Sequence, residues 1–199
     1  STTSVWTEIG EGLQVLKQVP SVRGAMLHLV LLYSLLAALY VLALQLAALI
    51  ESLGPSGFGA LLAMSGVGMA MGAVVIAQAG HRFSRRRLSA TGLGTITWTL
   101  VLLSQLRGSL GFTLGLCGIL GVGAALVAIP AQTTIQEETP ESERGRVFGL
   151  QNNLINIALS LPLVLAGTLV SSIGLQPVLL LLAGLALTAA LLERPWQRC

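Results

Sequence analysis

The chain has 199 residues, of which 54% are hydrophobic and only 10% are charged, and its mean hydropathy is +0.83. A water-soluble globular protein of this size cannot cover its surface with so few charged side chains, so the composition excludes that class. The formal net charge of +3 does not indicate nucleic-acid binding, because the basic residues are placed as in the loops of membrane proteins.

Residues 1–24 predict a cytoplasmic amphipathic helix that lies on the membrane surface before the first crossing. Apolar residues recur there at helical spacing, with charged residues between them, and Pro20 would end the helix. The apolar residues of this segment are Trp6, Ile9, Leu13, Leu16 and Val19.

Five long stretches of the chain contain no Lys, Arg, Asp or Glu. They cover residues 24–50, 52–81, 88–106, 108–136 and 147–192. Since roughly 20 helical residues cross a hydrocarbon core about 30 Å thick, each of the first four stretches predicts one crossing. The fifth is long enough for two crossings and divides at the turn-forming residues 171–177. We therefore expect six transmembrane helices, at about residues 25–50, 57–80, 88–106, 110–136, 147–171 and 175–193.

The basic residues predict the orientation of this bundle, which we assign to residues 25–194. If both termini lie on one side, that side carries all the Lys and Arg residues of the chain except Arg107. These residues are Lys17, Arg23, Arg82, Arg85, Arg86, Arg87, Arg144, Arg146, Arg194 and Arg198. Because positively charged loops remain in the cytoplasm, we expect cytoplasmic termini and a cytoplasmic tail at 195–199.

Two loops on the basic side carry ordered motifs. The first reads Gly-His-Arg-Phe-Ser-Arg-Arg-Arg-Leu over residues 80–88. The second runs from Thr139-Pro140 to Arg-Gly-Arg-Val-Phe-Gly at residues 144–149. With the six-helix pattern, these motifs resemble the carboxy-terminal six-helix half of a major facilitator superfamily transporter, nearest to its bacterial drug and macrolide exporter branches.

The resemblance implies an all-α membrane fold of two inverted three-helix repeats, which is half of a complete major facilitator fold. Its bacterial branches also imply the inner membrane of a bacterium as the location. It also implies that the loop after the second helix is a conformational latch between two halves. The latch candidates are His81, Arg82, Arg85 and Arg86. The three arginines match the family pattern, whereas His81 occupies the position of the family Asp, and Ala77 and Ser84 occupy the positions of its Gly residues. Topology alone is the other interpretation, because arginines at cytoplasmic helix ends orient helices and bind anionic headgroups in any membrane protein.

Amide side chains gather near one end of the fourth and fifth predicted helices, and several of them recur at helical spacing. Because an unpaired amide against lipid is costly, these groups should face protein or water. We predict that they line a vestibule or substrate path, together with a few polar residues of the first helix. The candidates are Tyr33, Gln45, Gln132, Gln136, Asn152, Asn153 and Asn156. The alternative is that they only fasten the fourth and fifth helices by hydrogen bonds.

Small residues four apart predict where helix backbones approach each other closely. The pairs are Gly68 with Gly72 in the second predicted helix, and Gly111 with Gly115 in the fourth.

The predicted function is that of half a secondary active transporter. We expect it to export amphiphilic or hydrophobic small molecules by alternating access with a second six-helix half, from the same precursor, a separate chain or a homodimer. The alternative is a six-helix scaffold or accessory subunit of a larger membrane complex that has lost transport. No enzyme is predicted, since the predicted helices contain no nucleophile–base pair or metal-ligand set. We expect no cofactor, no metal and no nucleic-acid partner, and a lipid bilayer as the surroundings.

Overall fold

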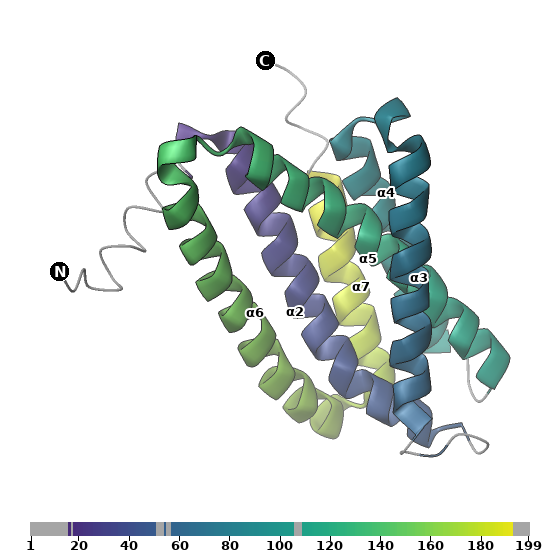
Figure 1. The fold of residues 1–199 in the computed structure, drawn as a ribbon. Coiled ribbons are helices and arrows are strands. Elements are labelled where there is room, and N and C mark those ends of the chain that lie inside the picture. Colours follow the sequence, from purple (N-terminus) through teal and green to yellow (C-terminus); the bar gives the residue numbers. More distant parts are fainter. Residues whose placement is uncertain (1–15, 17, 51–53, 55–56, 106–108, 193–199) are drawn as a thin grey trace.

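The computed structural model describes residues 16, 18–50, 54, 57–105 and 109–192, and their ordered elements are all helices. The elements are α2 (Pro20–Ala48), α3 (Phe58–Ala79), η2 (Gly80–Arg82), α4 (Arg85–Gln105), α5 (Leu110–Glu138), η3 (Glu141–Glu143), α6 (Arg144–Ile173) and α7 (Leu175–Leu192). Successive α-helices run in opposite directions, so α2 begins at the same end of the bundle at which α7 ends (Figure 1). That end also holds the α3–α4 and α5–α6 links, and we call it the arginine-rich end.

The helices confirm the predicted all-α membrane fold in its main feature. Among the described residues, α2, α3, α5, α6 and α7 are long and apolar enough to cross a membrane. The prediction of six crossings is therefore supported for five helices. The composition of α4 is more polar, so composition alone does not identify it as a sixth crossing.

The polar character of α4 comes from hydroxyl groups that the helix itself satisfies. The Oγ1 atoms of Thr95, Thr97 and Thr99 each donate to the carbonyl one turn earlier, at 2.8, 2.9 and 2.8 Å. Such back-bonding leaves no hydroxyl donor in need of water. Since α4 also packs against α5 and α7, it is an integral part of the bundle despite its lower hydropathy.

Helix α5 is the centre of the packing, and it crosses the bundle obliquely against α3, α4 and α2 (Figure 1). Its backbone lies very close to that of α3. A Cβ atom built on Gly121 would lie 2.0 Å from the carbonyl oxygen of Ser65, and one built on Gly68 would lie 1.9 Å from that of Gly118. Any side chain larger than hydrogen would therefore force these two helices apart.

The predicted small-residue contacts are half right. Gly68 is confirmed, and a Cβ atom on Gly72 would lie 2.8 Å from that of Ala125, so both glycines of α3 are close-contact positions. The prediction for Gly111 and Gly115 is wrong, because a Cβ atom there meets nothing within 4 Å. The oblique crossing places the contact farther along α5, beyond the first turns that contain those two residues.

The remaining helices pack through two pairings, α2 with α6 and α4 with α7. A large apolar core joins α2, α4, α5 and α7. Its fully buried members include Leu32, Leu35, Leu42, Leu93, Ile96, Leu100 and Leu179. A smaller core at the arginine-rich end joins α2, α5 and the start of α6.

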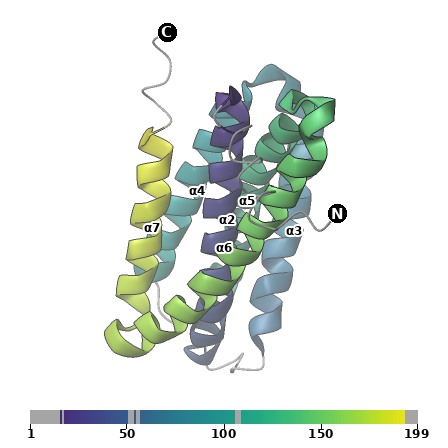
Figure 2. The same ribbon diagram turned by 90° about the vertical axis from the view of Figure 1, so that its left-hand side faces the viewer.

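Helices α3 and α6 are the least covered by the rest of the chain. Helices α3, α5 and α6 each contain an apolar stretch of 18 residues. In α5, 50% of the residues in that stretch are buried by the rest of the protein, but the share is only 17% in α3 and 11% in α6. In the side view, α3 and α7 lie at opposite edges of the bundle with α2 and α5 between them (Figure 2).

The predicted surface helix at 1–24 and the tail at 195–199 fall mostly or wholly outside the described residues. Leu16 is described, and it is buried in the smaller core with Val22 and Val147. Val19 also packs against this core, so the apolar face predicted for this segment contacts the bundle through Leu16 and Val19.

The close α3–α5 contact predicts a large difference between two glycines of α5. Gly121→Ala would place a methyl group inside the Ser65 carbonyl and destabilise the bundle by about 1–3 kcal/mol, the usual cost of overpacking. Gly115→Ala adds the same methyl group in open space on the same helix and should leave stability unchanged or slightly raised. The free energy of unfolding in mixed micelles measures both, and equal stability of the two variants would contradict the close contact.

Candidate functional site

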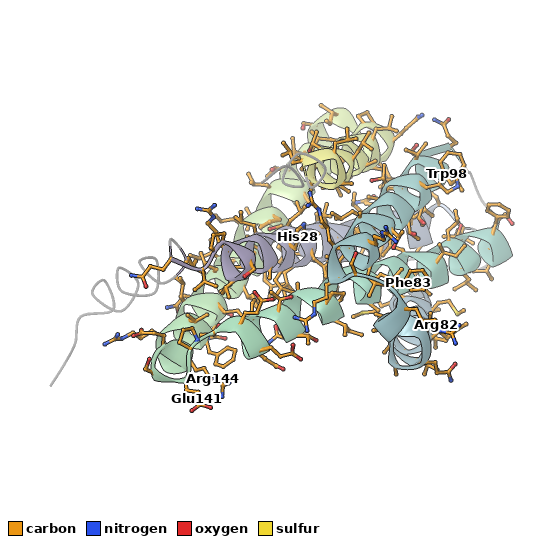
Figure 3. The ribbon with its side chains drawn as sticks, turned by 90° about the horizontal axis from the view of Figure 1, so that it is seen from above. His28, Arg82, Phe83, Trp98, Glu141 and Arg144 are labelled. Atoms are coloured by element: carbon orange, nitrogen blue, oxygen red, sulfur yellow. The ribbon has the colours of Figure 1, made fainter. Side chains whose placement is uncertain are left out.

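The link between α3 and α4 places four arginines at one end of the bundle. Helix α4 begins after Ser84, whose Oγ accepts a hydrogen bond from the backbone N–H of Arg87 at 3.3 Å, as an N-cap residue does. Arg82 and Phe83 precede it and are exposed beside the end of α3 (Figure 3). Arg85 and Arg86 then lie in the first turn of α4, where they face neighbouring helices.

Arg85 joins three helix ends through an ion-pair network. Its Nη2 atom is in close contact with Oε2 of Glu137, and its Nη1 atom lies 3.7 Å from Oε1 of Glu138 and 3.4 Å from Oγ1 of Thr134. Oε2 of Glu138 also accepts a hydrogen bond from the hydroxyl of Ser21 on α2. Because the Arg85 and Glu137 side chains are 42% and 59% exposed, the pair contributes little to stability, about 0–1 kcal/mol. Its geometry nevertheless links α2, α4 and α5.

The latch candidates are therefore in different surroundings. Arg82 is exposed, Arg85 is held by the two glutamates, and Arg86 is half-buried. His81 belongs to η2, and its side chain lies outside the part of the structure that is described. The role of these residues as a latch against a second half stays a prediction.

Two glutamines make a direct contact between α5 and α6. The Nε2 atom of Gln151 donates to Oε1 of Gln132 at 2.7 Å, and Gln151 is buried. The Oε1 atom of Gln151 is also buried and has no hydrogen-bond partner within the described residues. Gln132 thus fastens two helices, as the structural alternative proposed, whereas Gln136, one turn farther along α5, is exposed.

The asparagines of α6 lie on the opposite side of that helix from its buried residues. Asn152 and Asn156 are exposed and Asn153 is half-buried, whereas Gln151 and Ala158 are buried in the bundle. Ser160 is exposed as well, and its hydroxyl donates to the carbonyl of Asn156 at 2.8 Å. The structure therefore gathers Asn152, Asn156 and Ser160 on one uncovered face of α6, which we call the amide stripe.

The candidates on α2 do not join this stripe. Tyr33 is half-buried and packs against the smaller core, and Gln45 is exposed near the other end of α2. One turn before Gln45, Tyr40 is 45% exposed and makes an edge-to-face contact with Phe58 of α3, with ring centroids 5.9 Å apart.

Several residues of this region were not predicted from the sequence. They are Ser21, Thr134, Glu137, Glu138 and Gln151. A signal existed for Gln151, because it and Gln132 lie at similar distances from the link between two antiparallel helices, where residues face each other. The two glutamates end a helix opposite a basic loop, and opposite charges on neighbouring loops also indicate a contact.

The Gln132–Gln151 hydrogen bond predicts a measurable coupling. Gln132→Leu leaves the buried Gln151 amide without its acceptor and should destabilise the bundle by about 1–3 kcal/mol. The double variant Gln132→Leu with Gln151→Leu should recover part of that loss, with a coupling energy of about 0.5–2 kcal/mol in a double-mutant cycle. Gln136→Leu is the matched control, because Gln136 is exposed on the same helix. Purely additive changes in unfolding free energy would show that the contact is not made in the membrane.

Residues 26–196 match the Major Facilitator Superfamily, and the match extends from within α2 past the end of α7. No curated protein matches the chain at a significant level. Members of this superfamily are membrane transporters and not, in general, enzymes. The five apolar helices agree with an integral membrane protein. The chain therefore belongs to the Major Facilitator Superfamily, and its function is of the transporter type.

Proposed function

We propose that the chain is the carboxy-terminal half of a secondary transporter that works by alternating access against a second six-helix half. The amide stripe carries this proposal. Asn152, Asn156 and Ser160 are exposed on a helix apolar enough to cross a membrane, and side-chain amides against lipid cost free energy. A second bundle or a water-filled path would remove that cost, and both are present in an alternating-access transporter.

The helix pairings support an inverted-repeat arrangement. If α2, α3 and α4 correspond to α5, α6 and α7, the contact of α3 with α5 has a counterpart in the contact of α6 with α2. The contact of α4 with α7 is then its own counterpart, whereas the close contact of α4 with α5 has only a weak counterpart in that of α7 with α2. Under this correspondence α3 and α6 are equivalent, and both are poorly covered. We therefore assign the second half to their uncovered faces.

The same faces favour an amphiphilic or hydrophobic substrate. Exposed residues of α3 include Met69 and Met71, and the exposed part of α2 includes Tyr40. Such a surface offers few hydrogen-bond donors to replace the hydration of a sugar or a dianion, and methionine side chains adapt to varied shapes. The resemblance of the loops at 80–88 and 139–149 to those of drug and macrolide exporters supports export as the direction.

Site-specific photo-crosslinking in the native membrane tests the partner. A photoreactive side chain at Met71 of α3 or Val164 of α6, which are 60% and 67% exposed, should crosslink to a second six-helix bundle, identified by mass spectrometry. Trp98 is the matched control, since it is 66% exposed on α4 and lies away from α3 and α6 (Figure 3). Crosslinks from Met71 and Val164 to an unrelated complex would instead favour the scaffold function, and crosslinks to lipid alone would refute a protein partner.

Cysteine labelling tests whether the amide stripe meets water. In a background with Cys117 and Cys199 replaced by Ser, Asn152→Cys and Asn156→Cys should react with a membrane-impermeant maleimide from the arginine-rich side. Ile157→Cys, exposed in an apolar part of the same turn, should react at least tenfold more slowly, because a thiol in lipid is seldom ionised. Labelling of Asn156→Cys that changes with added substrate or inhibitor would support alternating access. If neither cysteine reacted with the maleimide in any condition, the amide stripe would be a permanent protein interface and not part of a water-filled path.

A further inference from the structure

A cavity lies on the other side of α2 from the amide stripe. It has a volume of about 750 Å³ at the arginine-rich end, between the starts of α2 and α4 and the ends of α5 and α7. His28, which lines it, lies among α2, α4 and α7 in the view from above (Figure 3). Among the described residues, those that line this cavity do not belong to α3 or α6, so it is separate from the surface assigned to the second half.

The polar part of the cavity wall is predominantly basic. Within the described part of the wall, the charged side chains are Arg23, Arg85 and Arg86 and the carboxylate of Glu138. Arg85 is already paired with Glu137 and Glu138. Arg86 differs, because its Nη2 atom is buried and has no hydrogen-bond partner among the described residues. A guanidinium nitrogen that is buried without an acceptor is costly. Because Nη2 has almost no accessible surface, a rotation of the Arg86 side chain toward an anionic ligand in the cavity would supply the acceptor.

The rest of the wall is apolar and includes an opening with exposed leucines from two helices that are apolar enough to cross a membrane. Leu27 of α2 and Leu192 of α7 both line the cavity, and they are 64% and 70% exposed. Helices α2 and α7 barely touch each other, and Leu31 and Ala189 line the cavity between them. A free anion would gain nothing from this apolar opening, whereas the tail of a lipid would cover it.

We propose that this cavity binds an anionic phospholipid, with the phosphate beside Arg86 and the first part of an acyl chain between Leu27 and Leu192. Guanidinium groups match phosphate oxygens in geometry and charge, and basic cavities between transmembrane helices bind acidic headgroups. The ligand would bridge the starts of α2 and α4 to the end of α7. All the residues of this proposed site belong to the chain itself, so the proposal depends neither on a second half nor on transport activity.

Lipid selectivity measures the charge requirement. The purified protein is reconstituted in phosphatidylcholine vesicles with a small fraction of spin-labelled phosphatidylglycerol or spin-labelled phosphatidylcholine, and the immobilised fraction of each label is compared. Arg86→Gln should weaken the preference for phosphatidylglycerol about tenfold, the effect of losing a charge-assisted hydrogen bond. Arg87→Gln removes the same charge from the same turn, but Arg87 is exposed and does not line the cavity, so its preference should be unchanged. Equal loss in both variants would reduce the effect to surface charge and overturn the site.

Two further arms separate a lipid from a soluble anion. Ala189→Phe narrows the apolar opening and retains every charge, so it should also reduce phosphatidylglycerol binding, and it tests the site even if Arg86→Gln fails to insert. Inorganic phosphate at millimolar concentration should leave the bound lipid in place. Full displacement by phosphate, or unchanged lipid binding in Ala189→Phe, would show that the ligand is not a lipid and would overturn the proposal.

Discussion

The bundle depends on the close approach of the α5 backbone to its neighbours. Lipid tails are as apolar as leucine, so helices in a membrane are held together by van der Waals packing and hydrogen bonds and not by the hydrophobic effect. Glycine allows that packing at Gly68 and Gly121 between α3 and α5, and at Gly92 and Gly123 between α4 and α5. Helices α6 and α7 are attached to this unit mainly through α2 and α4. The bundle thus has a tightly packed centre, and the outer helices α6 and α7 are each attached mainly through one neighbouring helix.

The same membrane requirement divides the polar side chains into groups satisfied inside the bundle and groups that need something outside it. The α4 threonines bond to their own helix, and Gln132 accepts from Gln151. Asn152 and Asn156 have no such hydrogen bond within the described residues, and they are exposed on the uncovered face of α6. The buried Nη2 atom of Arg86 also lacks an acceptor in the described chain. These two exceptions lie on different sides of α2, which is why they point to two different contacts, a protein half or water path for one and a lipid for the other.

The sequence predicts the helices well because each helix can be recognised from a single continuous stretch of the chain. A charge-free run of about 20 residues matches the thickness of the membrane, so it can be identified without knowing which helices pack beside it. The contacts between helices are not predictable in this way. Gly115 and Gly118 are equally small, and only the crossing point of α3 and α5 decides which one is in contact. Gln151 was likewise missed beside three asparagines, because its inward position depends on the rotation of α6 against α2. The basic loop indicated that Arg85 matters, but its partners on α5 follow from the way the helix ends meet.

The charges at the arginine-rich end are arranged against the preferences of their own helices. Arg85, Arg86 and Arg87 lie in the first turn of α4, where the helix dipole disfavours cations, and Glu137 and Glu138 lie in the last turn of α5, where it disfavours anions. Each such placement costs about 0.3–1 kcal/mol when exposed. Since the two ends meet, Arg85 lies near the negative end of α5 and the glutamates near the positive end of α4, which reverses the sign of the interaction for both. This arrangement stabilises the charges only while α4 and α5 stay together. A movement that separated these ends would leave Arg85, Glu137 and Glu138 each facing only the unfavourable dipole of its own helix, so this contact favours a movement in which α4 and α5 stay together.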